Sequence, residues 1–303
     1  MFTLSNQPSI LDYGSYQDPN YLALFEEALR YDKVGDVYTA VKLLKKVIRL
    51  VPDHPDAYAA LGKIYHRRRE WKPAFHYLSK VVALDADDRE AWWKLGHAAT
   101  GLKRFTVAGS VWAKFGMEKA RLGAAENIEI KTETGYEILW MQPLDAARAR
   151  ILSIPHPGSD LRFRDLVLYD RRNIVGSNIH NRRRTHVYSW LALLKQSPYR
   201  TFSCLLHSSD EIAIAKLENL CYDAGLGFEV WSNATRTMRG TPERATKAEK
   251  DNFPEYYNDL VPKPDHGTTL VALAAIHPAE VERVLNAWEI ITLEGFSDLR
   301  SYE

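Results

Sequence analysis

The hydrophobic and small residues in the first third of the chain recur every 34 positions. Ala40, Ala74 and Ala108 have this spacing, and several large apolar positions follow it in the same register. Pro52 closes the first unit, because proline lacks an amide N–H and disfavours helix in the residue before it. The period predicts three structural repeats that stack on one another, since one unit cannot bury its apolar face alone.

The motif within each unit resembles the tetratricopeptide repeat (TPR) signature, in which a large residue is followed by Leu-Gly, Tyr, Ala, an aromatic residue and Pro. The middle unit, from Pro55 to Asp85, fits this signature best. The third unit, from Glu90 to Gly116, has Ala99 where tyrosine is expected, and the first has Glu27 in the leucine position.

The resemblance implies an all-α superhelix of three helix-pair repeats that binds other proteins. We place this TPR domain at residues 21–123, after an N-terminal extension at 1–20. Each unit is then a pair of antiparallel helices, with the small Gly62 and Ala74 where two helices cross. Trp92 and Trp112 belong to the packing of the repeats in this interpretation.

Beyond residue 123 the pattern changes to an alternation of polar and apolar residues. From Asn127 to Gln142 the alternation surrounds a Thr-Gly pair, which predicts a β-hairpin. Two more strand-like segments lead to Asp170. The basic segment DRRNIVGSNIHNRRRTH, residues 170–186, is expected to be a loop, and residues 185–196 a helix capped by Thr185.

The last hundred residues alternate predicted strands and helices, interrupted by a polar insertion at 235–264. The order predicts an α+β domain over residues 124–303, with the ferredoxin-like (split β-α-β) arrangement as its candidate topology. A receiver- or Rossmann-like order is the alternative, although no glycine-rich phosphate loop follows an expected strand. The expected elements are strands at 200–207, 227–232, 268–277 and 289–296, a helix that ends at Gly225 with the apolar stripe Ile212, Ala215, Leu217 and Leu220, and a helix that starts at Pro278.

Composition favours a two-domain globular protein of the cytoplasm. The 303 residues are 46% hydrophobic and 26% charged, with no run of apolar residues long enough for a membrane helix and no secretory signal at the start. Only Cys204 and Cys221 are present, so we expect no disulfide framework. The net charge of +1 combines +5 up to Ala125 with −4 beyond it, which is not the balance of a dedicated nucleic-acid domain.

In TPR stacks the first helix of each unit lines a concave groove, and the resemblance carries this arrangement to the present chain. The groove is then mainly cationic and suited to an acidic peptide or a C-terminal carboxylate. The paired asparagines and lysines of the chaperone-tail clamp are not in place. Alternatively, Arg67 and its two neighbours solvate a helix end. The expected partner-binding residues are Lys63, His66, Arg67, Trp93, Lys94 and His97.

The basic segment at 170–186 offers a second place to bind an anion, because clustered arginines hold phosphate or carboxylate groups through paired hydrogen bonds. His180 and His186 could act there as an acid/base pair in phosphoryl transfer, or the arginines could contact nucleic acid; a solvated loop is the plainer alternative. The expected anion-binding residues are Arg171, Arg172, His180, Arg182, Arg183 and Arg184.

A zinc site built from His180, His186, Cys204 and His207 matches no metal-binding spacing, so we expect neither a metal nor a cofactor. The favoured hypothesis is a protein-interaction adaptor or scaffold, in which the TPR groove binds a protein and the α+β domain supplies a second contact or a regulatory output. The alternatives are a phosphate-ligand-binding or phosphoryl-transfer enzyme, and a nucleic-acid-associated module. A membrane partner is not expected.

Overall fold

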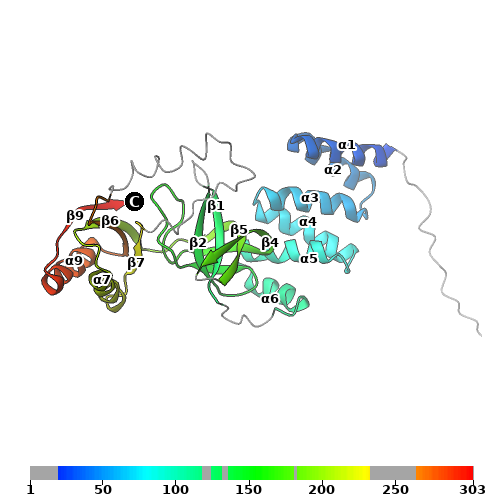
Figure 1. The fold of residues 1–303 in the computed structure, drawn as a ribbon. Coiled ribbons are helices and arrows are strands. Elements are labelled where there is room, and N and C mark those ends of the chain that lie inside the picture. The colour runs from blue at the N-terminus through cyan, green and yellow to red at the C-terminus, as the bar shows by residue number, and fades with distance from the viewer. Residues whose placement is uncertain (1–19, 118–123, 132–135, 181–182, 233–263, 303) are drawn as a thin grey trace, which may run out of the picture. The chain divides into compact units, whose positions relative to one another are not determined.

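The computed structural model describes residues 20–117, 124–131, 136–180, 183–232 and 264–302 (Figure 1). They form two compact units, and the division falls after Val111. The N-terminal extension expected at 1–20 and the insertion expected at 235–264 lie almost entirely outside the described residues.

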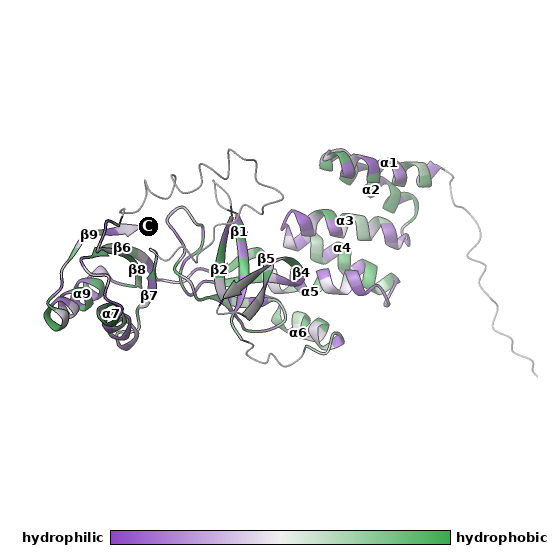
Figure 2. Cartoon of the chain, in the orientation of Figure 1, coloured by the Kyte–Doolittle hydropathy of each residue, from purple (hydrophilic) through white to green (hydrophobic). Residues whose placement is uncertain are grey.

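Helices alone make up the repeat region, as the 34-residue period predicts. Helix α1 packs with α2 and α3 with α4, while α2 also contacts α3 and α4 contacts α5. Figure 2 shows hydrophobic and hydrophilic residues side by side on these helices, which is the pattern of elements that bury one face. The helices are α1 (Asn20–Val34), α2 (Val37–Leu50), α3 (Pro55–Arg67), α4 (Trp71–Leu84), α5 (Arg89–Gly101) and α6 (Phe105–Lys114).

Small residues allow close packing within a repeat. A Cβ atom placed on Gly62 of α3 would lie 2.7 Å from a methyl carbon of Leu78 on α4, and Ala74 of α4 is fully buried. Trp112 is buried, as expected for a packing residue. Trp92 is only half-buried, and its indole N–H donates to the carbonyl of Ala86 at 2.8 Å.

The turns of the repeats recur with the same period. Arg69 and Lys103 each have a φ of 59° at the turn inside a helix pair, and their spacing equals the repeat length. Asp36 and Asp88 cap α2 and α5 by accepting hydrogen bonds from Thr39 N and Ala91 N. The Thr39 hydrogen bonds lower the pKa of Asp36 below its ordinary value.

Five strands form a closed barrel at the start of the second unit. Successive strands pair antiparallel, and β1 closes the barrel by pairing parallel with β5. Parallel closure follows because the meander has an odd number of strands. The strands are β1 (Glu126–Lys131), β2 (Tyr136–Pro143), β3 (Arg148–Ile151), β4 (Leu166–His180) and β5 (Arg183–Lys195).

The barrel confirms the hairpin expected at 127–142 and corrects the two elements expected after it. Residues 185–196 are not a helix, because Thr185–Lys195 belong to β5. The described residues of the basic segment, 170–180 and 183–186, are likewise not a loop. They form the end of β4 and the start of β5, and the two strands pair with a bulge between Asp170 and Ile174.

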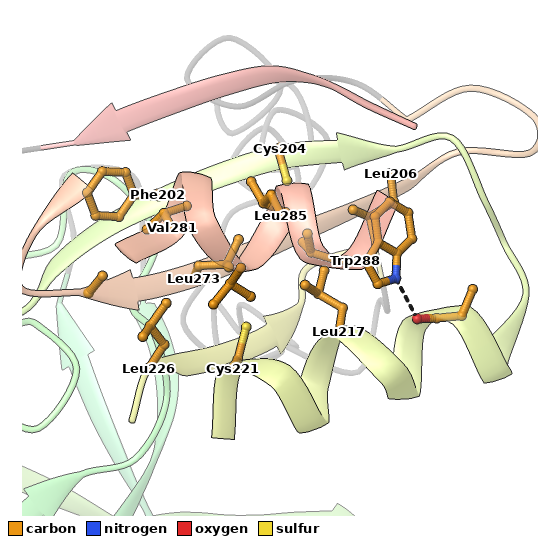
Figure 3. Close-up of a cluster of buried hydrophobic side chains, with 14 residues drawn as sticks. Phe202, Cys204, Leu206, Leu217, Cys221, Leu226, Leu273, Val281, Leu285 and Trp288 are labelled. Carbon is orange, nitrogen blue, oxygen red and sulfur yellow. Dashed lines mark hydrogen bonds between the residues drawn. The ribbon is translucent and has the colours of Figure 1, made fainter. Parts of the chain in front are cut away.

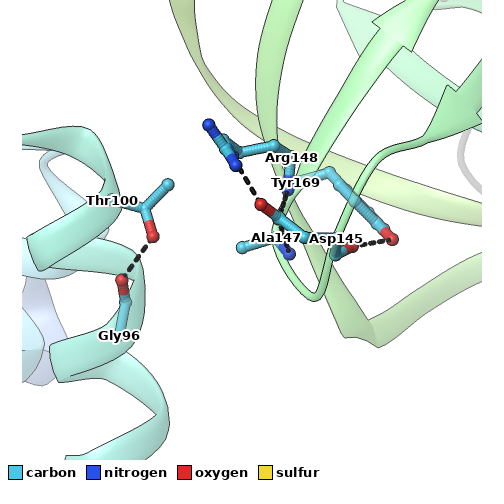
Figure 4. A network of polar contacts seen from close by, with 6 residues as sticks. All are labelled: Gly96, Thr100, Asp145, Ala147, Arg148 and Tyr169. Atoms are coloured by element: carbon cyan, nitrogen blue, oxygen red, sulfur yellow. Dashed lines mark hydrogen bonds and ion pairs between the residues drawn. The ribbon is translucent and has the colours of Figure 1, made fainter. Parts of the chain in front are cut away.

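A polar turn joins β2 to β3 (Figure 4). The Asp145 carboxylate accepts hydrogen bonds from Ala147 N at 3.0 Å and Arg148 N at 2.7 Å, and it also forms an ion pair with the Arg148 side chain. Tyr169, whose pKa is raised to about 12 by burial, donates its hydroxyl to the Asp145 carbonyl at 3.4 Å. Asp145 therefore closes the turn through backbone and side-chain contacts together.

The described residues after β5 form an antiparallel sheet with two helices. Among these residues the chain order is strand, helix, two strands, helix, strand, and the spatial order is β7-β8-β6-β9. The Rossmann-like alternative is wrong, because every strand pair of this sheet is antiparallel. The elements are β6 (Arg200–Leu206), α7 (Glu211–Asp223), β7 (Gly227–Val230), β8 (Thr269–Ala275), α9 (Pro278–Thr292) and β9 (Phe296–Tyr302).

Alternate residues of β6 and β8 face two different hydrophobic layers. Phe202 and Cys204 of β6 and Leu273 of β8 pack with α7 and α9 in one core (Figure 3). Leu205 and Ala272 face the opposite side, where they pack with Ile154 and other residues of the segment between β3 and β4. Because strand side chains alternate between faces, a nearly continuous apolar strand indicates this burial on both sides.

Two predicted details of this region are wrong. Ile212 is 67% exposed, and the buried stripe of α7 is instead Ala213, Leu217 and Cys221, which lie one helical turn apart. Residues 289–292 are the last turn of α9 and not the start of a strand, since Leu293 ends that helix in the left-handed conformation at φ 61°.

Candidate functional site

The expected groove residues lie on α3 and α5, the first helices of the second and third repeats. They fall into two groups. Lys63 and Arg67 are exposed and Lys94 is half-buried, whereas His66, Trp93 and His97 are buried. The cationic groups therefore lie at the surface of the two helices, and the aromatic rings lie inside.

Two of the surface cations already have acidic neighbours. Arg67 forms a two-point ion pair with Asp32 of α1, with one of its contacts at 3.3 Å, and this pair connects the first repeat to the second. Lys94 pairs with Glu90 one turn earlier on α5. The Glu90–Lys94 pair can be recognised from the sequence, because a glutamate four residues before a lysine stabilises a helix.

The buried aromatic group connects α3 to α5. His66 Nε2 and His97 Nδ1 are hydrogen-bonded at 3.2 Å, and the Trp93 ring meets the His97 ring edge-on at 5.5 Å between centroids. His66, Trp93 and His97 are 8%, 2% and 0% exposed. A hydrogen bond between two buried imidazoles requires one of them to donate and the other to accept, which fixes the orientation of both rings. These residues consequently hold the second and third repeats in register.

The structure also brings Arg171 and Arg172 to an exposed stretch of β4. His180 and Arg183 are backbone neighbours across the hairpin, as are His186 and Ser177. Arg182 lies outside the described residues, as do the side chains of His180, Arg183 and Arg184. The exposed His186 ring lies 6.1 Å from the Tyr188 ring.

The two cysteines are buried thiols of the α/β core. Burial raises the pKa of Cys204 and of Cys221 to about 12 in each case, so the reactive thiolate is suppressed at neutral pH. His207 is exposed and hydrogen-bonded to Ser297 Oγ at 2.9 Å. Within the described residues no cluster of three or more His, Cys, Asp or Glu side chains is placed to hold a metal ion.

The packing of α1 to α5 in successive antiparallel pairs defines a helical-repeat protein in the first third of the chain. Residues 34–99 match the family model of the tetratricopeptide repeat. The resemblance predicted from the 34-residue period is confirmed by this match. No curated protein matches the chain. The described helices include none that is both long and apolar enough to cross a membrane.

Solved structures that resemble this chain overlap with about a third of it. The first TPR of Spaghetti (RPAP3), bound to an HSP90 peptide, is 22% identical over 31% of this chain and 75% of its own, with a TM-score of 0.29. MamA is 26% identical over 32% of this chain and 57% of its own, with a TM-score of 0.30. Yeast Tom70 is 19% identical over 36% of this chain and 22% of its own, with a TM-score of 0.32.

Proposed function

We propose that this protein is an adaptor whose TPR region binds an acidic segment of a protein partner. The observation that carries the proposal is the presence of Lys63, Arg67 and Lys94 at the surface of adjacent first helices, in a region that matches a family of protein-binding repeats. Ammonium and guanidinium groups in such an arrangement bind carboxylates through charge-assisted hydrogen bonds.

The existing ion pairs are compatible with this role. Arg67–Asp32 and Lys94–Glu90 are at least partly exposed, and exposed pairs contribute only about 0.2–1 kcal/mol to stability. A partner carboxylate can therefore share or replace Asp32 and Glu90 at small cost. Lys63 has no hydrogen bond or ion pair with a described residue, so its charge is available without such an exchange.

The buried residues of the proposed site act as its framework. The His66–His97 hydrogen bond and the Trp93 ring fix α3 against α5 and thereby set the separation of the cations on the two helices. A partner then meets a rigid pair of helices, which lowers the entropy lost on binding.

The second unit supplies a further contact in this proposal. We assign the six elements that the structure describes after β5 to a ferredoxin-like fold, on the basis of their strand-helix-strand-strand-helix-strand order and the spatial order β7-β8-β6-β9. The basic segment at 170–186 provides the second contact, with an acidic protein surface. The residues that make this contact are Arg171, Arg172, His180, Arg182, Arg183 and Arg184. A cytoplasmic location and a scaffolding role belong to the same proposal.

Affinity capture from the source cell, read by quantitative mass spectrometry, tests the adaptor function. The full chain is compared with a Lys63→Ala/Lys94→Ala double variant and with a Lys72→Ala/Lys80→Ala control, which removes two exposed lysines from α4. We expect one partner to be recovered by the full chain and the control, and to fall by about tenfold or more in the first variant, as two lost contacts of about 1 kcal/mol each require. Equal recovery by all three chains would show that the groove is not the binding site.

A further inference from the structure

The second unit contains a polar cavity that no sequence pattern indicated. It has a volume of about 330 Å³ and lies between the segment that links β3 to β4 and the strands β6 and β9. The linking segment contributes Pro155 to Ser159, Leu161 and Arg162, and the strands contribute Thr201, Ser301 and Tyr302. The cavity lies on the sheet face opposite α7 and α9. Thr201 is on the same side of β6 as Leu205, and Leu205 packs in the hydrophobic layer on that face.

Buried and half-buried carboxylates hold the wall of this cavity in place. Glu137 of the barrel, 1% exposed, accepts a hydrogen bond from His156 N at 3.1 Å, and Glu229 of β7 accepts one from Ile154 N at 2.8 Å. Asp165 is fully buried and accepts from Arg162 N at 2.7 Å and from Ser197 N at 2.6 Å. Side chains from both the barrel and the sheet therefore fix the position of the segment, so the cavity has an ordered wall.

Hydrogen-bond donors line the interior. The half-buried guanidinium of Arg162 forms no hydrogen bond or ion pair with a described residue, although its charge acts on Asp165. The Tyr302 hydroxyl shares a hydrogen bond with Ser203 Oγ at 2.8 Å, and burial raises the pKa of Tyr302, so the hydroxyl keeps its proton. Thr201, which pairs with Tyr302 on the same face of the sheet, adds another hydroxyl group. His156 lies against the Trp231 ring at 4.5 Å, which gives one side of the cavity an aromatic backing.

We propose that this cavity binds a small molecule with a single carboxylate group, which pairs with the Arg162 guanidinium and accepts hydrogen bonds from the hydroxyl groups around it. The planar fork of an arginine matches the two oxygens of a carboxylate. A phosphate monoester fits less well, because its second negative charge would enter a region where the carboxylates of Glu137, Asp165 and Glu229 hold the wall and Arg162 is the one lysine or arginine among the lining residues.

The size of the cavity limits the ligand further. Its volume is at the lower end of the range of about 300–1,000 Å³ that is typical of small-molecule sites. A metabolite-sized acid fits this space, whereas a dinucleotide or a folded peptide does not. The proposal does not rest on partner binding by the repeats, since all the residues involved belong to the second unit.

Saturation-transfer difference NMR on the full chain tests the proposal and detects binding at millimolar affinity. The probes are acetate, glycolate and benzoate, each compared with its primary amide and with methyl phosphate at matched ionic strength. We expect signals from at least one carboxylate, weaker signals in Tyr302→Phe, and in Arg162→Gln signals no larger than those of the amide. The Arg150→Gln variant removes an exposed charge from β3 of the same unit and should retain the full signal.

The outcomes separate clearly. Circular dichroism first establishes that each variant keeps the thermal transition of the wild type, and if Arg162→Gln does not, Tyr302→Phe serves as the deciding variant. The proposal is overturned by carboxylate signals that are undiminished in the deciding variant, that equal those of the amides in the wild type, or that are absent from the wild type. Binding of methyl phosphate alone would overturn the choice of carboxylate.

Discussion

Gly62 lies at a close contact between α3 and α4 within the second repeat. We expect Gly62→Ala to destabilise the repeat region by about 1–3 kcal/mol, because the new methyl group would lie 2.7 Å from a Leu78 methyl carbon and would overfill a packed contact. The measurement is urea unfolding followed by circular dichroism.

Gly109→Ala on α6 is the matched control. A Cβ atom at Gly109 would have no described atom within 4 Å, so alanine should raise stability by about 0.5–1 kcal/mol through its better helix propensity. If both substitutions had the same sign, the close packing inferred at Gly62 would be refuted.

The two thiols provide a second test at the residue scale. Since burial raises the pKa of Cys204 and Cys221 to about 12, we expect iodoacetamide to leave both unmodified in the folded chain at pH 8 and to modify both in urea. Mass spectrometry counts the labels. Rapid labelling of either cysteine before unfolding would contradict its place in the core.

The sequence pattern did not distinguish exposed from buried residues among the expected partner-binding residues. Repeat register predicts that Lys63 and Arg67 line a groove together with His66, Trp93 and His97. In the structure the two cationic residues are exposed, whereas the three aromatic residues are buried. Their hydrogen bonds and ring contacts across helices depend on packing that no local pattern specifies.

At the scale of elements, the side chain of Trp288 connects α9 to α7 by a hydrogen bond as well as by packing. Trp288 is fully buried, and its indole N–H donates to the Ala213 carbonyl at 2.8 Å (Figure 3). We expect Trp288→Phe to reduce the free energy of unfolding by about 1–3 kcal/mol, because it removes this hydrogen bond and part of the core volume. Denaturant unfolding followed by circular dichroism measures the change.

Ile290→Ala is the control on the same helix, since Ile290 is 77% exposed and should change stability by less than about 0.5 kcal/mol. A loss in Trp288→Phe no greater than in this control would argue against the packing of α9 described above.

Helix-capping residues and short apolar strand segments made most elements of the α+β region predictable from the sequence. Asp210 caps α7 and Pro278 opens α9, and both are local signals; α9 begins where expected. Residues 185–196 were misassigned because their leucines and alanine favour helix locally, whereas the long pairing with β4 and the parallel pairing with β1 determine the strand. The closure of the barrel depends on pairing between distant segments, and the periodicity of one segment cannot predict it.

For the whole molecule, the division into a helical part and a sheet-containing part follows from the change of pattern along the chain, and the opposite net charges of the two parts follow from composition. The polar cavity could not be predicted in this way. Its residues come from one linking segment and two strands that are distant in sequence, and only the closed barrel and the sheet bring them together.

The central claim is that an acidic partner segment lies on the cations of α3 and α5. The most direct measurement is zero-length carbodiimide cross-linking of the captured complex, which joins lysine amines to carboxylates in contact, followed by peptide sequencing. We expect Lys63 and Lys94 to be joined to aspartate or glutamate of the partner, with Lys72 and Lys80 of α4 unlinked. A bound partner whose cross-links avoid both Lys63 and Lys94 would contradict the account.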